Sequence, residues 1–169
     1  MKCHLIPKDS EIDNSTYAMA NEFILRAPSF LGFSDSYVGI ANPVLVCGYQ
    51  YLGAQRGKLG GDGVWRSSRF GVGTVYFSEN ALHFYRCYYS IIDSDYRDYV
   101  DVIPYNEIIS VSLVGYNDQF NLRQMSYSAL QINTKGRNPI FFAMQDVNSA
   151  MNYVRVITDI VNSRRNMYY

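Results

Sequence analysis

Residues 138–165, NPIFFAMQDVNSAMNYVRVITDIVNSRR, change their hydrophobic period in the middle, and this change decides the fold class. Before Asp146, alternation predicts a strand whose buried face is made by Ile140, Phe142 and Met144. After Asp146, apolar residues recur at the 3.6-residue spacing of an amphipathic helix, at Val147, Ala150, Met151, Val154, Ile157 and Val161. Asp146 is a suitable N-cap, and Arg164 and Arg165 complement the C-terminal end of the helix dipole. We therefore expect a β-sheet that is covered by a C-terminal helix.

Strand signals arrive at regular intervals upstream, beginning at Val44. The stretch 70–92 holds two apolar runs joined by turn residues, and Pro104 divides the stretch 99–115 into two strands because proline cannot donate a ladder hydrogen bond. The segments 44–54, 127–134 and 138–145 raise the number to seven strands, with the polar stretch 116–125 as a connection. This order predicts a mainly β fold of the α+β class, a seven-stranded antiparallel barrel or bent sheet capped by the helix.

Residues 1–43 are predicted to be an N-terminal extension to a main domain of residues 44–169. Helical spacing of apolar residues predicts a short helix in the extension, with Asn14 or Ser15 as its N-cap and Pro28 at its end. The Gly, Ser and Pro residues between positions 29 and 43 predict an irregular connection.

The composition is that of one folded domain. The chain has 169 residues, of which 48% are hydrophobic and 18% are charged, so it is long enough for one core and too apolar to be disordered. Lys and Arg balance Asp and Glu at 15 each, and we expect no nucleic-acid partner because there is no overall field to attract one. No apolar run reaches the length of a signal peptide or a membrane span. We expect a cytoplasmic protein that can lie peripheral to a membrane.

No recognisable catalytic or metal-binding motif occurs, so we expect a protein that is not an enzyme and has no cofactor or metal. The three cysteines lack paired spacing and are interpreted as reduced apolar residues: Cys3, Cys47 and Cys87. The two histidines, His4 and His83, are interpreted as a terminal and a structural residue. Four acids cluster without the glycine and final glutamate of a calcium loop, which favours a solvated turn: Asp93, Asp95, Asp98 and Asp101. An enzyme that uses these acids is the remaining alternative.

Two stretches, VGTVYFSENALHFYR (72–86) and VIPYNEIISVSL (102–113), are followed by a hairpin and a helix, and this order resembles the pleckstrin-homology superfold and its GRAM and bacterial relatives. The most specific residues are Ile103, Pro104, Ile108 and Val111, which are similar to the I-P-x-x-x-I-x-x-V strand pair of GRAM-type domains. The resemblance covers residues 44–165 and implies a domain that acts by binding. The N-terminal 40 or so residues have no counterpart in such domains.

A glycine-rich segment, QRGKLGGDGVWRSSR (55–69), is the candidate ligand-binding site. It carries basic side chains and one tryptophan, opposed within the segment only by Asp62: Arg56, Lys58, Trp65, Arg66 and Arg69. In the resembled family, phosphoinositide-binding members hold head-group phosphates in the loop between their first two strands, which implies this role here. A mobile, solvated loop anchored by the tryptophan is the alternative. On either interpretation, we expect the four basic side chains to contribute little to stability.

Sixteen tyrosines suggest strand packing or a contact surface. Five fall within a short span, and alternation cannot bury all of them on one face: Tyr85, Tyr88, Tyr89, Tyr96 and Tyr99. We predict that some of them face a protein partner or a second copy in a homo-oligomer. The function we expect is a non-enzymatic module that recognises a protein partner or an anionic, phosphoinositide-like phospholipid head group. The alternative is a small inhibitor or regulatory protein, such as a phage or bacterial accessory factor, that acts through its tyrosine-rich surface.

Overall fold

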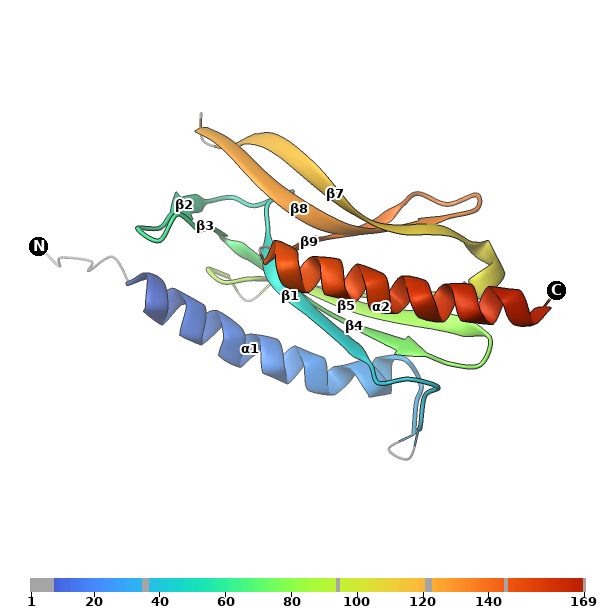
Figure 1. Ribbon diagram of the computed structural model, residues 1–169. Helices are drawn as coiled ribbons and strands as arrows, with labels where there is room; N and C mark the ends of the chain where they lie inside the picture. Colours follow the sequence, from blue (N-terminus) through green and yellow to red (C-terminus); the bar gives the residue numbers. More distant parts are fainter. Residues whose placement is uncertain (1–7, 35–36, 94, 121–122, 145, 169) are drawn as a thin grey trace, which may run out of the picture.

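The computed structural model describes residues 8–168, apart from 35–36, 94, 121–122 and 145, and shows two long helices, with the strands between them in chain order (Figure 1). The helices are α1 (Asp9–Phe30) and α2 (Val147–Arg165). The strands are β1 (Val44–Gln50), β2 (Gly57–Leu59), β3 (Trp65–Ser67), β4 (Arg69–Phe77), β5 (Ala81–Ser90), β6 (Tyr96–Pro104), β7 (Ile108–Phe120), β8 (Arg123–Thr134) and β9 (Ile140–Met144). Cys3 and His4 lie outside the described residues.

The strands form three antiparallel sheets. One has four strands in the order β1-β4-β5-β6, a second has three in the order β7-β8-β9, and β2 and β3 form a separate hairpin. The seven predicted strands are all present, and Pro104 does end β6 before β7 begins at Ile108. The β2–β3 hairpin is additional and lies within the glycine-rich segment. The described strands form open sheets and no closed barrel, so the barrel form of the prediction is not observed.

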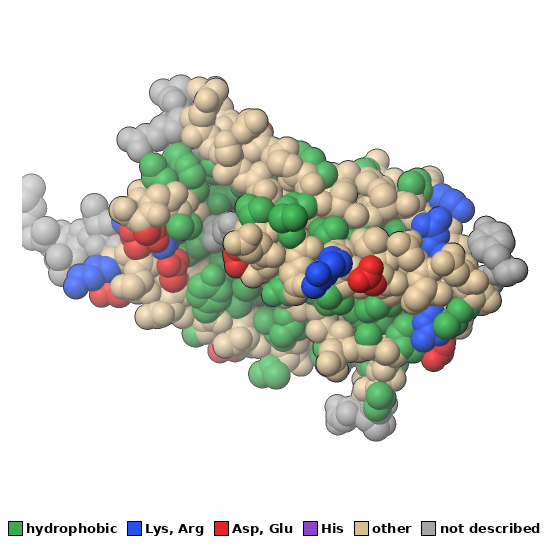
Figure 2. All heavy atoms as spheres, in the orientation of Figure 1, with side chains coloured by type: hydrophobic (Ala, Val, Ile, Leu, Met, Phe, Trp, Pro, Cys, Tyr) green, Lys and Arg blue, Asp and Glu red, His purple; other side chains and the backbone are tan. Residues whose placement is uncertain are grey.

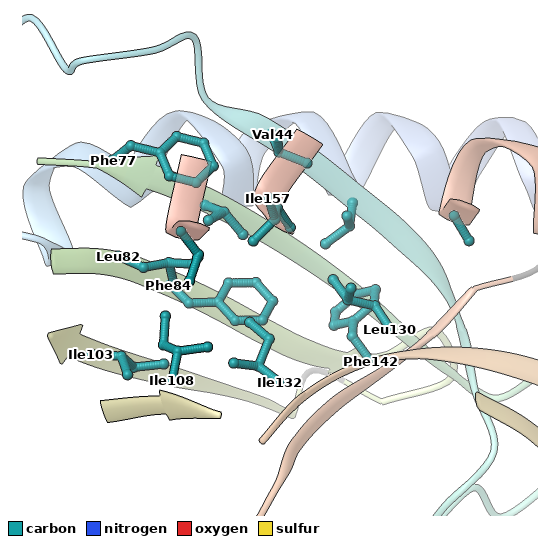
Figure 3. Packing of buried hydrophobic residues seen from close by; sticks show 14 of the residues in the cluster. Val44, Phe77, Leu82, Phe84, Ile103, Ile108, Leu130, Ile132, Phe142 and Ile157 are labelled. Atoms are coloured by element: carbon teal, nitrogen blue, oxygen red, sulfur yellow. The ribbon is translucent and has the colours of Figure 1, made fainter. Parts of the chain in front are cut away.

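The four-stranded sheet is covered on both faces, as Figure 1 shows, with α1 on one side and the three-stranded sheet and α2 on the other. We call these its outer and inner faces, respectively. Strand β4 supplies both layers by alternation, because Phe70 and Val72 point to the outer face and Val75 and Phe77 to the inner face. The inner core also takes residues from α2 and from β8 and β9, and Figure 3 shows these side chains pointing toward one another.

The C-terminal helix is confirmed, with a narrower buried stripe than predicted. Asp146 caps it by accepting a hydrogen bond from Asn148 N at 3.0 Å. Ala150, Ile157 and Val161 are buried and Val154 is half-buried. Two residues assigned to the apolar stripe, Val147 and Met151, are instead exposed.

The N-terminal helix is much longer than the short one predicted. It begins at Asp9, where the Lys8 backbone N donates to Glu11 Oε2 at 3.1 Å, so Asn14 and Ser15 lie within it and do not cap it. It also continues past Pro28 to Phe30. Apolar residues of α1 are buried against the outer face, and this packing holds the last turn in spite of the hydrogen bond that proline cannot donate.

Most of the polar stretch 116–125, predicted as a connection, belongs to strands, with residues 116–120 in β7 and 123–125 in β8. Polar side chains bond across the two strands here, with Ser126 Oγ donating to Asn117 Oδ1 at 2.7 Å. Polar cross-strand pairs therefore stabilise this end of the hairpin, where the sequence shows no alternation of apolar residues.

The side chain of Gln50 joins the two larger sheets. Its Nε2 donates to the carbonyl of Ala143 at 3.2 Å, and its Oε1 accepts from the backbone N of Ala143 at the same distance. Both residues are buried. The side-chain amide thus takes the place of a ladder pair between β1 and β9.

Replacing Gln50 by Leu is expected to lower the free energy of unfolding by about 2 kcal/mol or more, because both backbone groups of Ala143 lose their partner away from water. Urea unfolding followed by circular dichroism measures the change. The same substitution at the exposed Gln124 is the control and is expected to cost about 0.5 kcal/mol or less. Equal losses in the two variants would show that the bridge does not stabilise the fold.

Candidate functional site

A cleft of about 340 Å³ opens at one end of the inner face, between the four-stranded sheet and β9. It is lined by Gln50, Leu52, Gly53, Arg69, Arg86, Tyr88, Tyr99, Pro139 and Phe141. Two arginines, three aromatic rings and one amide thus face the same space. This combination suits a ligand that has both an anionic group and a flat or apolar part.

Glycines determine the shape of the cleft. At Gly71 a side chain would meet the Phe142 ring at 2.9 Å and the Gln50 side chain at 3.0 Å, so only glycine lets these two groups lie over β4. Gly53 has a φ of +74°, and a side chain there would lie 2.9 Å from Arg69 Nη1. The absence of side chains at both positions therefore makes room for the groups that line the cleft.

Arg86 is held firmly within the cleft. Its Nη2 donates to Asp101 Oδ2 at 2.5 Å, and its guanidinium lies 5.4 Å from the ring centroid of Tyr99 and 6.0 Å from that of Tyr88. The side chain is only 14% exposed, and its buried Nε has no hydrogen-bond partner among the described residues. Arg86 is thus a fixed cation whose Nε is a buried donor that the described residues leave unused.

Arg69 lies at the rim of the same cleft and is half-buried. It also borders a smaller hollow that contains Asp93 and Asp95. Within the described part of the chain, no carboxylate forms an ion pair with it. Since Asp101 balances the charge of Arg86, Arg69 gives the cleft a net positive charge.

The glycine-rich segment is an ordered hairpin in which two of the predicted ligand-binding cations are already neutralised. Lys58 and Arg66 are cross-strand partners on β2 and β3. Lys58 Nζ lies 2.7 Å from Asp9 Oδ1, and Arg66 Nη2 lies 2.6 Å from Asp13 Oδ2. Arg66 also pairs with Asp62 at 2.8 Å. Asp62 is therefore not the only acid that opposes these cations, because α1 supplies two more.

Arg66 is buried, with its side chain only 6% exposed. The expectation that the basic side chains contribute little to stability assumed that they are exposed, and this residue is instead buried in ion pairs. Its guanidinium bonds hold the pKa of the Asp13 and Asp62 carboxyls below the ordinary range. We conclude that Arg66 joins the hairpin to α1.

The five predicted ligand-binding residues do not come together. Arg56 is exposed, Lys58 and Arg66 face α1, and Arg69 enters the cleft. Trp65 lines a different hollow, of about 460 Å³, together with Tyr51, Tyr116 and Tyr127. No charged side chain of the described residues lines this second hollow, so it offers no cation to an anionic ligand.

The five tyrosines are divided between the two faces of the four-stranded sheet. Tyr85 and Tyr89 are buried under α1, where they pack against Phe30 and Phe23. Tyr88 lies on the inner face against Phe142. The remaining two, Tyr96 and Tyr99, are 48% and 42% exposed on β6. Only these last two present large exposed surfaces to a partner.

A further apolar groove runs along β1 between the two helices, lined by Tyr17, Leu45, Cys47, Val64, Met144, Asp146, Ser149 and Tyr153. Figure 2 shows hydrophobic side chains gathered on this face of the molecule. Leu45 is 45% exposed there. The groove offers contact surface, and no cation from the described part of the chain lines it.

Three of the residues considered for catalysis or metal binding are held in structural contacts: His83, Asp98 and Asp101. His83 Nε2 lies 3.0 Å from Ser78 Oγ in the β4–β5 turn, and burial lowers the pKa of the imidazole. Alternation along β6 separates the acids, because Asp98 bonds to Tyr85 on the outer face whereas Asp101 bonds to Arg86 on the inner face. Among the described residues, no three His, Cys, Asp or Glu side chains are grouped to hold a metal ion.

Comparison with known proteins adds no identification. No protein-family model matches the chain, and no curated protein is significantly similar to it. No helix of the described residues is long and apolar enough to cross a membrane.

Sequence analysis overlooked Arg86, although a signal was present. Alternate residues of β5 face inward: Leu82, Phe84, Arg86 and Tyr88. Arg86 is thus a charged residue at a position where the alternation predicts a buried apolar one. A buried cation needs a nearby acid or an anionic ligand to compensate for its loss of water. The acid that pairs with Arg86 is Asp101 on the neighbouring strand β6. Asp101 lies directly opposite Phe84 of β5, two residues before Arg86.

Proposed function

We propose that this chain is a non-enzymatic binding module that holds an anionic group, such as the phosphate of a phosphoinositide-like head group, in the cleft between Arg69 and Arg86. The observation that carries the proposal is the cleft itself, where Arg69, which has no acidic partner among the described residues, stands beside a fixed arginine and three aromatic rings. Charge-assisted bonds from guanidinium groups suit phosphate oxygens, and the rings suit the carbon skeleton that bears them.

The architecture supports a pleckstrin-homology or GRAM-like relationship, which we also propose. Seven main strands lie in two packed antiparallel sheets, and one C-terminal helix contributes to the core between them. The residues of the GRAM-like pattern support it too, because Ile103 and Ile108 are buried in this core on either side of Pro104. The ligand position that we propose differs from the one the resemblance implied, since it uses Arg69 from the glycine-rich segment but not Lys58 or Arg66.

Replacing Arg69 by Gln is expected to weaken binding of inositol hexakisphosphate roughly 10- to 100-fold, as the loss of one charge-assisted hydrogen bond to phosphate implies. Isothermal titration calorimetry measures the affinity. Arg56→Gln is the matched control, because Arg56 lies 13 positions earlier in the same segment, is exposed and has no acidic partner among the described residues. Binding by the wild-type protein should weaken as salt rises, since exposed charges are screened within about 8 Å at physiological ionic strength.

Vesicles that contain phosphatidylserine distinguish a lipid surface from a soluble phosphate. Co-sedimentation with such vesicles that Arg69→Gln abolishes would place the protein at a membrane surface, whereas binding of inositol phosphate alone would indicate a soluble ligand. If the wild-type protein binds neither probe, or if both variants bind equally well, the cleft is not an anion site. The aromatic hollow beside Trp65 and the groove along β1 would then favour a protein ligand.

A further inference from the structure

Strand β6 is the free edge of the four-stranded sheet. Among the described strands it pairs only with β5, whereas β1, at the opposite edge, is joined to β9 through Gln50. Four of its nine residues are large hydrophobics that are more than 40% exposed: Tyr96, Tyr99, Val100 and Val102. A long, exposed and apolar edge of this kind is a template for a further strand.

The hydrogen bonds to β5 determine which backbone groups of β6 are free. In the β5–β6 register, Ser90 N donates to Asp95 O at 2.9 Å, and Tyr105 N donates to Asn80 O at 3.3 Å. Hydrogen-bonded pairs alternate with non-hydrogen-bonded pairs along an antiparallel ladder, so the odd-numbered residues of β6 bond to β5. The even-numbered residues direct their N–H and C=O groups outward: Tyr96, Asp98, Val100 and Val102.

We propose that two copies of this chain associate through their β6 strands, which pair antiparallel about a two-fold axis at Tyr99. In this register Tyr96 lies opposite Val102 of the other copy, and Asp98 lies opposite Val100. These are hydrogen-bonded pairs, so all four outward-directed residues of each copy find partners. Tyr96 with Val102 is also a favourable aromatic and β-branched pair.

Charge complementarity supports the same register. The non-hydrogen-bonded pairs, whose side chains approach most closely, place Arg97 opposite Asp101 of the other copy on both sides of the axis. Arg97 is exposed and forms no ion pair among the described residues, and Asp101 is half-buried beside Arg86. Each Asp101 would then lie between two arginines, one from each copy.

The neighbouring symmetric registers are worse. An axis at Asp98 sets the two Asp98 carboxylates directly opposite each other. An axis at Val100 sets Tyr96 opposite Pro104, which cannot donate a hydrogen bond. On the outer face α1 packs mainly on β4 and β5. It touches β6 at one end, where Phe23 and Arg26 contact Tyr96 and Arg26 pairs with Asp98, whereas Val100 and Val102 stay exposed and leave space for the second copy. The two sheets would join into one of eight strands, with the two clefts side by side at Tyr99.

Disulfide trapping tests the register directly. Tyr99→Cys should form a covalent dimer on mild oxidation, since residues opposite each other in a non-hydrogen-bonded pair have Cα atoms about 4.5 Å apart, within the range of a disulfide. Arg97→Cys is the matched control on the same face, and its two copies would lie roughly 13 Å apart, too far to cross-link. The wild-type chain is run beside both variants to report any contribution from its native cysteines. Of these, Cys87 is buried, and this burial raises the pKa of its thiol to about 12.

Sedimentation velocity of the unmodified chain tests the association itself. Its mass should rise with concentration from that of one chain to that of two, and Val100→Pro should remain monomeric because it removes an outward N–H that β5 does not use. A strict monomer at all concentrations, together with no cross-link in the Tyr99→Cys variant, overturns the proposal. So does a dimer that cross-links efficiently in the Arg97→Cys variant. Binding of an extended peptide from another protein at β6, without self-association, would also overturn it.

Discussion

Replacing Ile157 by Asp should leave the protein largely unfolded at neutral pH. Ile157 has no exposed surface and lies in the inner core, where α2 meets residues of both larger sheets (Figure 3). A carboxylate there has neither water nor a cation, and substitutions of this kind cost more than about 4 kcal/mol, close to the total stability of many domains. Circular dichroism with thermal and urea unfolding measures the loss of cooperative structure.

The control for this change lies on the same helix. Met151→Asp adds the same charge at a position that is 59% exposed, and its effect should stay within about 0.5 kcal/mol. A chain that ends before Asp146 should lose cooperative melting as well, because it lacks Ala150, Ile157 and Val161. A truncated chain that melts at the wild-type temperature would show that α2 is dispensable.

The main strands and α2 were predictable because their patterns reflect the faces they bury. The inward-facing residues of β9 and the buried residues of α2 both belong to the inner core. Pro104 marks a strand boundary because proline has no N–H, whatever the rest of the fold is. The extent of α1 was not predictable in this way. Pro28 is a local stop signal, and only the packing of residues such as Ala27 against the outer face overrides it.

The candidate site was harder to predict because ion pairs depend on which elements meet. Asp9 and Asp13 are one helical turn apart, and Lys58 and Arg66 are cross-strand partners. Each spacing is visible in the sequence once the elements are known. The two acids meet the two basic residues only when α1 packs against the hairpin. A cluster of basic residues in the sequence therefore overestimates the positive charge that is free to bind a ligand.

Replacing Arg66 by Met should lower the free energy of unfolding at pH 7 by about 2 to 3 kcal/mol, the range for hydrogen bonds to charged groups and below that of a fully buried ion pair. The guanidinium bonds both oxygens of Asp13, with Nε to Oδ1 at 2.9 Å and Nη2 to Oδ2 at 2.6 Å, and it bonds both oxygens of Asp62 as well. We discount the cost of a fully buried pair because Asp13 is 28% exposed and Asp62 is 49% exposed.

The acid dependence of this loss identifies its cause. Arg66 lowers the pKa of Asp13 in the folded protein, so this ion pair stabilises the fold above the ordinary aspartate pKa of about 4 and its contribution disappears as the pH falls through the lowered pKa. The difference in stability between the wild-type protein and Arg66→Met should therefore shrink as urea titrations are repeated from pH 7 toward pH 2.

Arg66→Lys should recover only part of the loss, because an ammonium group cannot bond both carboxylates in the fork geometry of a guanidinium. Lys58→Met, which breaks the more exposed pair with Asp9, should cost much less than Arg66→Met at pH 7. A loss in Arg66→Met that stays constant down to pH 2 would mean that the alkyl packing of Arg66, and not its charge, joins the hairpin to α1.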